Sequence, residues 1–218
     1  MTPFPSGQLA GLKPKISPDP KGGILWLGVS VSRYSSQLVS VPMSRQMLDY
    51  LNEQQRFAKQ VSPEVHRLLV RRLFPKDYDW DEKQRWETMD PDLKIYDGRK
   101  TMYQQLNESR LCVGTYHSTT DLETLAENYP TITYFNPELN EFRDSAQTYF
   151  DELQRVGIFH TTPESAAKKV NEVYEDPLLW WNSKDVQDVR ERFCYRFART
   201  SKDWISEWKE ELQKIAEE

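Results

Sequence analysis

Short apolar segments alternate with helix-like segments along most of this 218-residue chain. The apolar segments are brief and rich in β-branched residues, a composition typical of buried strands. Strands separated by helices need crossover connections, so the alternation predicts a parallel sheet with helices on both faces. The expected strands cover residues 23–31, 66–71, 93–96, 111–115 and 131–135, with a short one near 158, and the expected helices cover residues 45–60, 101–109, 119–128, 138–155, 163–174 and most of 183–217.

The expected fold class is therefore α/β, a Rossmann-like doubly wound parallel sheet of about six strands with additional C-terminal helices. We assign residues 23–218 to this domain, with Ser44 as the cap of its first helix. Residues 1–22 are rich in Pro, Gly, Lys and Ser, which predicts a linker or arm instead of a packed element. A linker in this position suggests that another part of the protein precedes it.

Charge and composition restrict the possible partners and compartments. The formal net charge of −5 argues against nucleic acid, because phosphate backbones bind basic surfaces. Cys112 and Cys194 lie far apart in apolar stretches, so we expect buried reduced thiols. The sequence shows neither a signal-peptide pattern nor an apolar run near the ~20 residues of a membrane span. We therefore expect a cytoplasmic protein without a transmembrane segment.

The loop at residues 116–120 follows an expected strand and opens an expected helix. Ligands of open parallel sheets bind beyond the carboxyl ends of the strands, and a helix N-terminus offers unpaired N–H groups to phosphate. Ser118, Thr119 and Thr120 add hydroxyl donors, and His117 is suited to donating to a phosphate or acting as a base. This loop is therefore the predicted phosphate site.

Glu123 lies three residues after Thr120, close to the same helix end. A carboxylate in this position can accept two hydrogen bonds from a ribose diol. The same spacing also fits a capping box in which Thr120 and Glu123 only stabilise the helix. Both interpretations remain open from the spacing alone.

Arg72 ends an expected strand and is the predicted arginine ligand of a diphosphate. The planar guanidinium matches two phosphate oxygens, whereas the alternative is a salt bridge to Asp77, Asp79 or Glu82. Weaker candidates occupy other loops: Arg33, Arg99 and Lys100 for phosphate, and Glu138, Glu141 or Arg143 for a donor sugar. No His, Cys and Asp cluster has metal-ligand spacing, so we expect neither a metal nor a cofactor, and no catalytic residue is identified.

Residues 111–137 resemble the nucleotide-binding segment of glycosyltransferases with two facing Rossmann domains, the GT-B fold. Thr120, Glu123 and the stretch Asn128-Tyr129-Pro130 match that frame. Two features depart from it: His117 and Ser118 replace the usual glycine pair, and Asn128-Tyr129 replaces the usual glycine before Pro130. The approach of the backbone to a diphosphate is therefore expected to differ.

A closer resemblance covers almost the whole chain through three long segments, residues 71–86, 119–167 and 180–198. They are similar to the C-terminal part of a family of transferases of bacterial surface-carbohydrate biosynthesis, such as lipopolysaccharide synthesis. This closer resemblance implies a family, a fold and a separate N-terminal half, but it does not give a substrate. Together with the GT-B frame, we expect a nucleotide-sugar donor as substrate, a carbohydrate acceptor, and a general base supplied by the other half. Two alternatives are transfer of a polyol phosphate from a cytidine nucleotide, and a non-catalytic domain that binds a partner.

Overall fold

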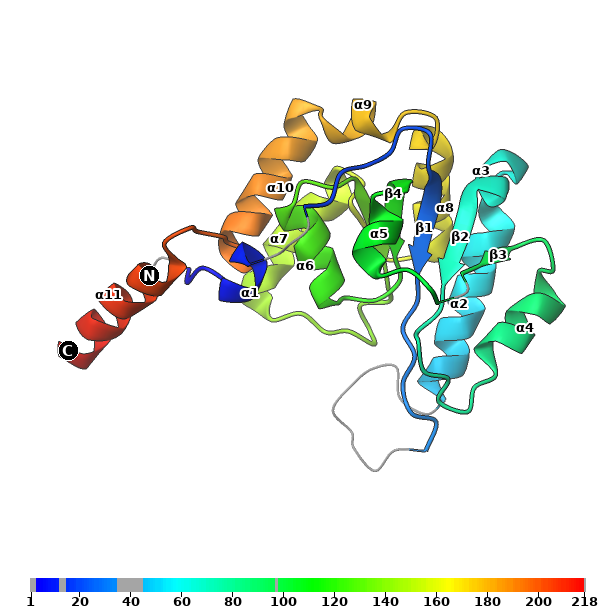
Figure 1. Ribbon diagram of the computed structural model, residues 1–218, viewed down its shortest axis with the longest axis horizontal. Helices are drawn as coiled ribbons and strands as arrows, with labels where there is room; N and C mark the ends of the chain where they lie inside the picture. Colours follow the sequence, from blue (N-terminus) through cyan, green and yellow to red (C-terminus); the bar gives the residue numbers. More distant parts are fainter. Residues whose placement is uncertain (1–2, 12–14, 35–44, 97, 218) are drawn as a thin grey trace.

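The computed structural model describes residues 3–11, 15–34, 45–96 and 98–217 of the chain. Six strands form one sheet in the order β3-β2-β1-β4-β5-β6, and every neighbouring pair is parallel. Strands β2, β1 and β4 lie side by side in Figure 1. This confirms the predicted α/β class and the Rossmann-like strand order. The strands are β1 (Gly23–Leu27), β2 (Leu69–Arg72), β3 (Lys94–Ile95), β4 (Ser109–Gly114), β5 (Thr131–Tyr134) and β6 (Phe159–His160).

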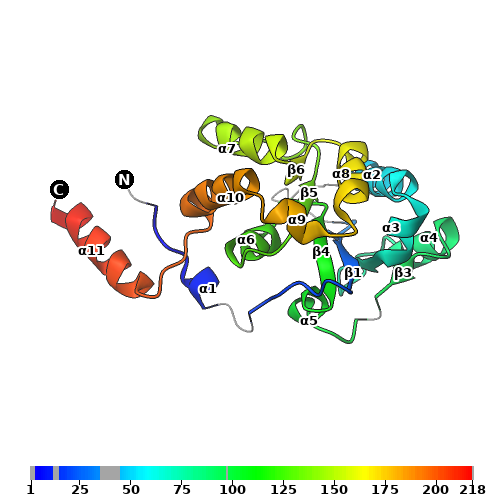
Figure 2. The same cartoon turned by 90° about the horizontal axis from the view of Figure 1, so that it is seen from above.

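Helices cover both faces of the sheet, as the view from above shows (Figure 2). Apolar side chains of α2 and α8 pack on one face, and those of α5 pack on the other. In the described part of the chain no helix is both long and apolar enough to span a membrane. The helices are α1 (Gly7–Ala10), α2 (Gln46–Gln60), α3 (Pro63–Leu68), α4 (Glu82–Met89), α5 (Met102–Leu106), α6 (Thr119–Ala126), α7 (Asp144–Arg155), α8 (Pro163–Val173), α9 (Pro177–Trp181), α10 (Lys184–Phe197) and α11 (Trp204–Glu217).

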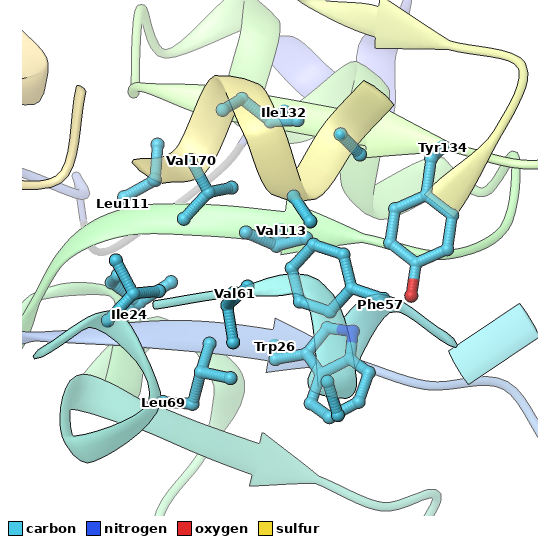
Figure 3. Packing of buried hydrophobic residues seen from close by; sticks show 14 of the residues in the cluster. Ile24, Trp26, Phe57, Val61, Leu69, Leu111, Val113, Ile132, Tyr134 and Val170 are labelled. Atoms are coloured by element: carbon cyan, nitrogen blue, oxygen red, sulfur yellow. The ribbon is translucent and has the colours of Figure 1, made fainter. Parts of the chain in front are cut away.

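The largest core cluster lies between the sheet and α2, α3, α4 and α8 (Figure 3). The Trp26 and Phe57 ring centroids are 5.1 Å apart, and Phe57 stacks on Tyr134 at 5.0 Å. Leu25, next to Trp26 in β1, belongs to a cluster on the opposite face. The central strands are thus buried on both faces, which explains why their sequences are continuous apolar runs.

The predicted strand at residues 66–71 is wrong in its first half, because residues 66–68 belong to a helix. Ser62 accepts a hydrogen bond from the backbone N–H of Val65 at 3.3 Å, and Pro63 occupies the first helical turn. These two residues are an N-cap signal and begin α3, so that β2 starts only at Leu69.

Other element boundaries also differ from the sequence prediction. Helix α7 begins at Asp144, not at Glu138, because Asn136 forms a turn in which its side chain accepts from the backbone N–H of Glu138 at 2.9 Å. The expected C-terminal helical region is divided into α10 and α11. Helices α4 and α9 were not predicted, and the predicted cap Ser44 lies outside the described residues.

Parts of the N-terminal segment pack against the domain, although its composition predicts an unpacked arm. Leu9 in α1 and Ile16 are both buried. Phe4 lies against Trp208 of α11 with ring centroids 4.4 Å apart, and the Trp208 indole N–H donates to the Pro5 carbonyl at 2.8 Å. These apolar side chains are sufficient to anchor a chain rich in Pro and Gly, which explains the difference.

The capping of α3 gives a first prediction. We expect Ser62→Ala to lower the free energy of unfolding by ~1 kcal/mol, because the substitution removes the side-chain acceptor at the helix start. Ser183 precedes α10 without a side-chain capping bond, so Ser183→Ala is the matched control and should cost less. Urea denaturation measures both variants, and equal losses would contradict the assignment of Ser62 as a cap.

Candidate functional site

A cavity of about 320 Å³ opens at the carboxyl ends of β1, β2 and β4. The chain runs outward from β1 to β3 and then returns to place β4 beside β1, so the cavity lies where the strand order reverses. Ligands of doubly wound sheets bind at this kind of position. The cavity is lined by residues 27–29 at the end of β1, 72–75 at the end of β2, 114–116 at the end of β4, 118–121 at the start of α6, and Met102.

The N-terminus of α6 forms one wall of the cavity. Ser118 is the N-cap residue, and its backbone N–H donates to the carboxylate of Asp121 at 3.0 Å. The reciprocal cap is therefore made by Ser118 and Asp121, and the proposed capping box of Thr120 and Glu123 is wrong. Because the helix starts at Thr119, Thr119 and Thr120 lie in its first turn, where the N–H groups have no partner within the helix.

Arg72 lies on the opposite wall of the cavity. Alternation along β2 buries the neighbouring Arg71 on one face of the sheet and leaves Arg72 on the other. One Arg72 nitrogen, Nη1, donates to the Lys100 carbonyl at 3.1 Å and to the side chain of Gln105, and the guanidinium lies 5.2 Å from the Tyr96 ring centroid. Within the described residues Arg72 forms none of the salt bridges considered from the sequence.

Two predicted site residues do not line this cavity. His117 points into a separate apolar recess, with its ring 5.9 Å from that of Phe135 and 5.6 Å from that of Phe150. Partial burial there lowers the pKa of His117, which favours the neutral imidazole. Glu123 is buried and accepts a hydrogen bond from the Tyr103 hydroxyl at 3.3 Å. The structure therefore brings together Arg72, Ser118, Thr119 and Thr120, and leaves His117 and Glu123 outside.

A bridge between two strand ends was not anticipated from the sequence. The Thr115 hydroxyl donates to the Leu27 carbonyl at 2.7 Å and lies 2.7 Å from the Tyr50 hydroxyl, which in turn accepts from the Val29 N–H at 2.9 Å. These bonds fix the loops after β1 and β4 beside the cavity. A polar residue directly after an apolar strand was the available signal for Thr115, but nothing in the sequence pairs it with Tyr50.

Gly28 forms part of the cavity floor and has a steric reason to be glycine. A Cβ atom at this position would lie 2.3 Å from Nη2 of Arg71. The buried guanidinium therefore occupies the space that any side chain at residue 28 would need. This contact could not be predicted from the sequence, because Gly28 follows β1 whereas Arg71 lies in the neighbouring strand β2.

Asp121 is the titratable group at the base of the cavity. Burial raises its pKa to about 7, and hydrogen bonds from the Ser118 backbone and the Thr133 hydroxyl oppose the rise. His117 Nδ1 is 3.9 Å from the carboxylate, and the buried Cys112 thiol lies near it. The spacing of Ser118 and Asp121 is itself a capping signal, whereas the same spacing of Thr120 and Glu123 forms no cap because the helix begins at Thr119.

The weaker candidates lie elsewhere. Arg33 donates to the Asp79 carbonyl at 3.1 Å and packs on Trp80, and neither it nor Arg99 or Lys100 lines the cavity. Cys112 and Cys194 are buried and free, as expected. In the ranges that the structure describes, no three His, Cys, Asp or Glu side chains gather into a set able to hold a metal ion. Glu138, Glu141 and Arg143 are also absent from the cavity wall.

Comparison with known proteins adds a family. Residues 1–212 match the model of a family described as LIC12162 family transferase. No curated protein matches the chain.

The buried carboxyl of Asp121 gives a second prediction. Its pKa is about 7 in the folded protein against an ordinary value of 3.8, so the folded state holds this proton more tightly. Stability contributed by the neutral carboxyl is therefore present at low pH and is lost as the pH rises towards 7. Between the ordinary pKa of 3.8 and about pH 7, we expect the free energy of unfolding of wild type to fall by up to ~1.4 kcal/mol per pH unit relative to Asp121→Asn.

Urea unfolding of both proteins between about pH 5 and about pH 8 measures this difference. His160, whose pKa is lowered by burial to about 4, titrates in both proteins, so its contribution cancels. A constant difference in unfolding free energy across the range would show that Asp121 is ionised throughout.

Proposed function

Since the chain belongs to the LIC12162 family of transferases, we propose that its cavity binds the diphosphate of a nucleotide-sugar donor for a transfer reaction. One observation carries the proposal. Arg72 and the N-terminus of α6 line the same cavity, at the switch point of a parallel sheet. This arrangement offers a charged fork and helical N–H groups to one anionic ligand.

The two walls make different contacts with a diphosphate. The first turn of α6 provides backbone N–H groups and the hydroxyls of Thr119 and Thr120, together with the partial positive charge of a helix start. Arg72 uses only Nη1 for its hydrogen bonds to the described residues, which leaves Nη2 and Nε for phosphate oxygens. Gln105 and Tyr96 hold the guanidinium in place, so little side-chain entropy is lost on binding.

The remaining walls suit the nucleoside. Leu27, Val29, Phe74, Pro75 and Met102 provide apolar surface for a base. A volume of about 320 Å³ is within the range of small-molecule sites. With a pKa of about 7, Asp121 is partly neutral near physiological pH, which reduces its repulsion of a phosphate.

The acceptor belongs to another part of the proposed enzyme. A reaction between donor and acceptor is fast only when both are held in register, with a base beside the acceptor hydroxyl. We assign the donor to this domain, and the carbohydrate acceptor and the base to a second half. The resemblance to transferases of bacterial surface carbohydrates supports this division and a role in polysaccharide synthesis.

Arg72 provides the test of donor binding. We expect Arg72→Lys to weaken binding of a nucleoside diphosphate by ~10-fold or more, since an ammonium cannot reproduce two parallel contacts and bonds to charged groups contribute ~1.5–3 kcal/mol. Binding of the corresponding nucleoside should not change. Isothermal titration calorimetry with uridine, cytidine and guanosine diphosphates measures the effect and also identifies the base.

Arg33→Lys is the matched control, because Arg33 lies outside the cavity and packs on Trp80. It should leave the dissociation constant unchanged. Loss of affinity for nucleoside and diphosphate alike in Arg72→Lys would indicate a damaged fold, and absence of any diphosphate binding by wild type would refute the proposed function.

A further inference from the structure

Asp121 places an acidic side chain in the wall of the cavity that we assign to a diphosphate. It is the third residue of α6 and is only 5% exposed. Its carboxylate accepts from the Ser118 backbone N–H at 3.0 Å and from the Thr133 hydroxyl at 3.4 Å. A nearby like charge disfavours the ionised form of a buried carboxyl. Binding of a diphosphate and ionisation of Asp121 therefore oppose each other.

The Asp121 carboxylate and the proposed phosphate use neighbouring donors at one end of α6. The carboxylate takes the N–H of Ser118, and the next two N–H groups, of Thr119 and Thr120, have no partner within the helix. On its other side the carboxylate lies against the end of β4, where a Cβ atom at Gly114 would be 2.7 Å from Oδ1. These contacts hold the acidic group beside the donors that a phosphate would use.

The basic side chains on the cavity side leave the charge of Asp121 uncompensated. In the described part of the chain the carboxylate has one ion-pair contact, with His117 Nδ1 at 3.9 Å. Burial lowers the pKa of His117, so this imidazole is neutral when the carboxyl ionises. Arg72 lies on the opposite wall, where Nη1 donates to the Lys100 carbonyl and to the side chain of Gln105.

The elements packed around Asp121 add no cation within the ranges that the structure describes. From β4 comes the Cys112 thiol, whose pKa is raised by burial, so it stays neutral. Strand β5 presents an uncharged hydroxyl, and α7 presents an aromatic ring. On α6 itself, burial raises the pKa of Glu123, which accepts from the Tyr103 hydroxyl. Arg190 of α10 donates to a backbone carbonyl at the far end of α6. Protonation is therefore the available means of neutralising the Asp121 carboxyl.

We propose that Asp121 couples donor binding to proton uptake: the cavity holds the diphosphate while the Asp121 carboxyl carries a proton, and the ionised carboxyl weakens binding. The proton comes from solvent and returns to solvent when the diphosphate leaves. This inference rests on the proposed function, because the diphosphate must occupy the cavity.

The direction of the pH dependence follows from this coupling. Burial raises the pKa of Asp121 to about 7 in the free protein, and a bound diphosphate raises it further. Affinity is therefore full at a pH below the free value and declines as the pH rises through it towards the bound value. The decline is steepest just above neutral pH.

Isothermal titration calorimetry of the whole chain with uridine, cytidine and guanosine diphosphates tests the inference. Titrations in buffers of different ionisation enthalpy give the number of protons taken up on binding. The ligand also titrates, but its contribution is the same for wild type and Asp121→Asn and cancels in their difference. Near pH 8 wild type should take up as much as ~0.9 proton more than the variant, and from about pH 7 to about pH 8 it should lose up to ~5-fold in affinity relative to the variant.

Controls separate this coupling from other titrating groups. His117→Gln should keep the proton uptake, and the matching nucleoside, which carries no phosphate charge, should bind without it. Thr133→Val removes a hydrogen bond that favours the ionised carboxylate, so it should move the decline in affinity to higher pH; it replaces Asp121→Asn if that variant fails to fold.

Equal proton uptake by wild type and Asp121→Asn, an unmoved decline in Thr133→Val, or loss of the uptake in His117→Gln overturns the inference. Diphosphate binding by wild type upholds the proposed function in each of these cases, whereas no diphosphate binding by wild type overturns both.

Discussion

The parallel pairing of β1 with β4 is the constraint on which the candidate site depends. Leu25 pairs with Cys112 and Trp26 with Val113, although the chain forms β2 and β3 between the two strands. After β1 the chain continues to β2 on one side, and after β4 it continues to β5 on the other side. The loops that leave β1 and β4 therefore diverge, and the Tyr50 and Thr115 hydroxyls link the beginnings of these loops. Val29 and Thr115 are therefore held beside the cavity by hydrogen bonds within the protein.

The sheet was predictable because strand burial is encoded locally. Continuous apolar runs around Trp26, Val113 and Ile132 can only be buried on both faces, which requires helices between parallel strands. The strand at residues 66–71 was overestimated because apolar character alone does not separate a short helix from a strand. Ser62 and Pro63 carried the deciding information, since a capping residue followed by proline specifies a helix start.

The residues of the candidate site were predictable only where the position along a helix or strand determines the direction of the side chain. Arg72 follows from alternation along β2, and the hydroxyls of Thr119 and Thr120 follow from the start of α6. His117 and Glu123 were placed in the site by sequence proximity, but their directions depend on packing against Phe150 and Tyr103. The bridge between Thr115 and Tyr50 could not be predicted, because it joins residues of different elements that no local pattern pairs.

The contact between Gly28 and Arg71 links two positions that are distant in sequence. A side chain at residue 28 would meet Arg71 Nη2 at 2.3 Å, so it could enter only if the buried guanidinium moved or a smaller residue replaced the arginine. Such an exchange would also leave space beside Trp26 and remove the donor to Gln54. During divergence of the family, changes at residue 28 are therefore expected to accompany changes at residue 71, because a glycine in a strand-end loop is constrained by a cation on the neighbouring strand.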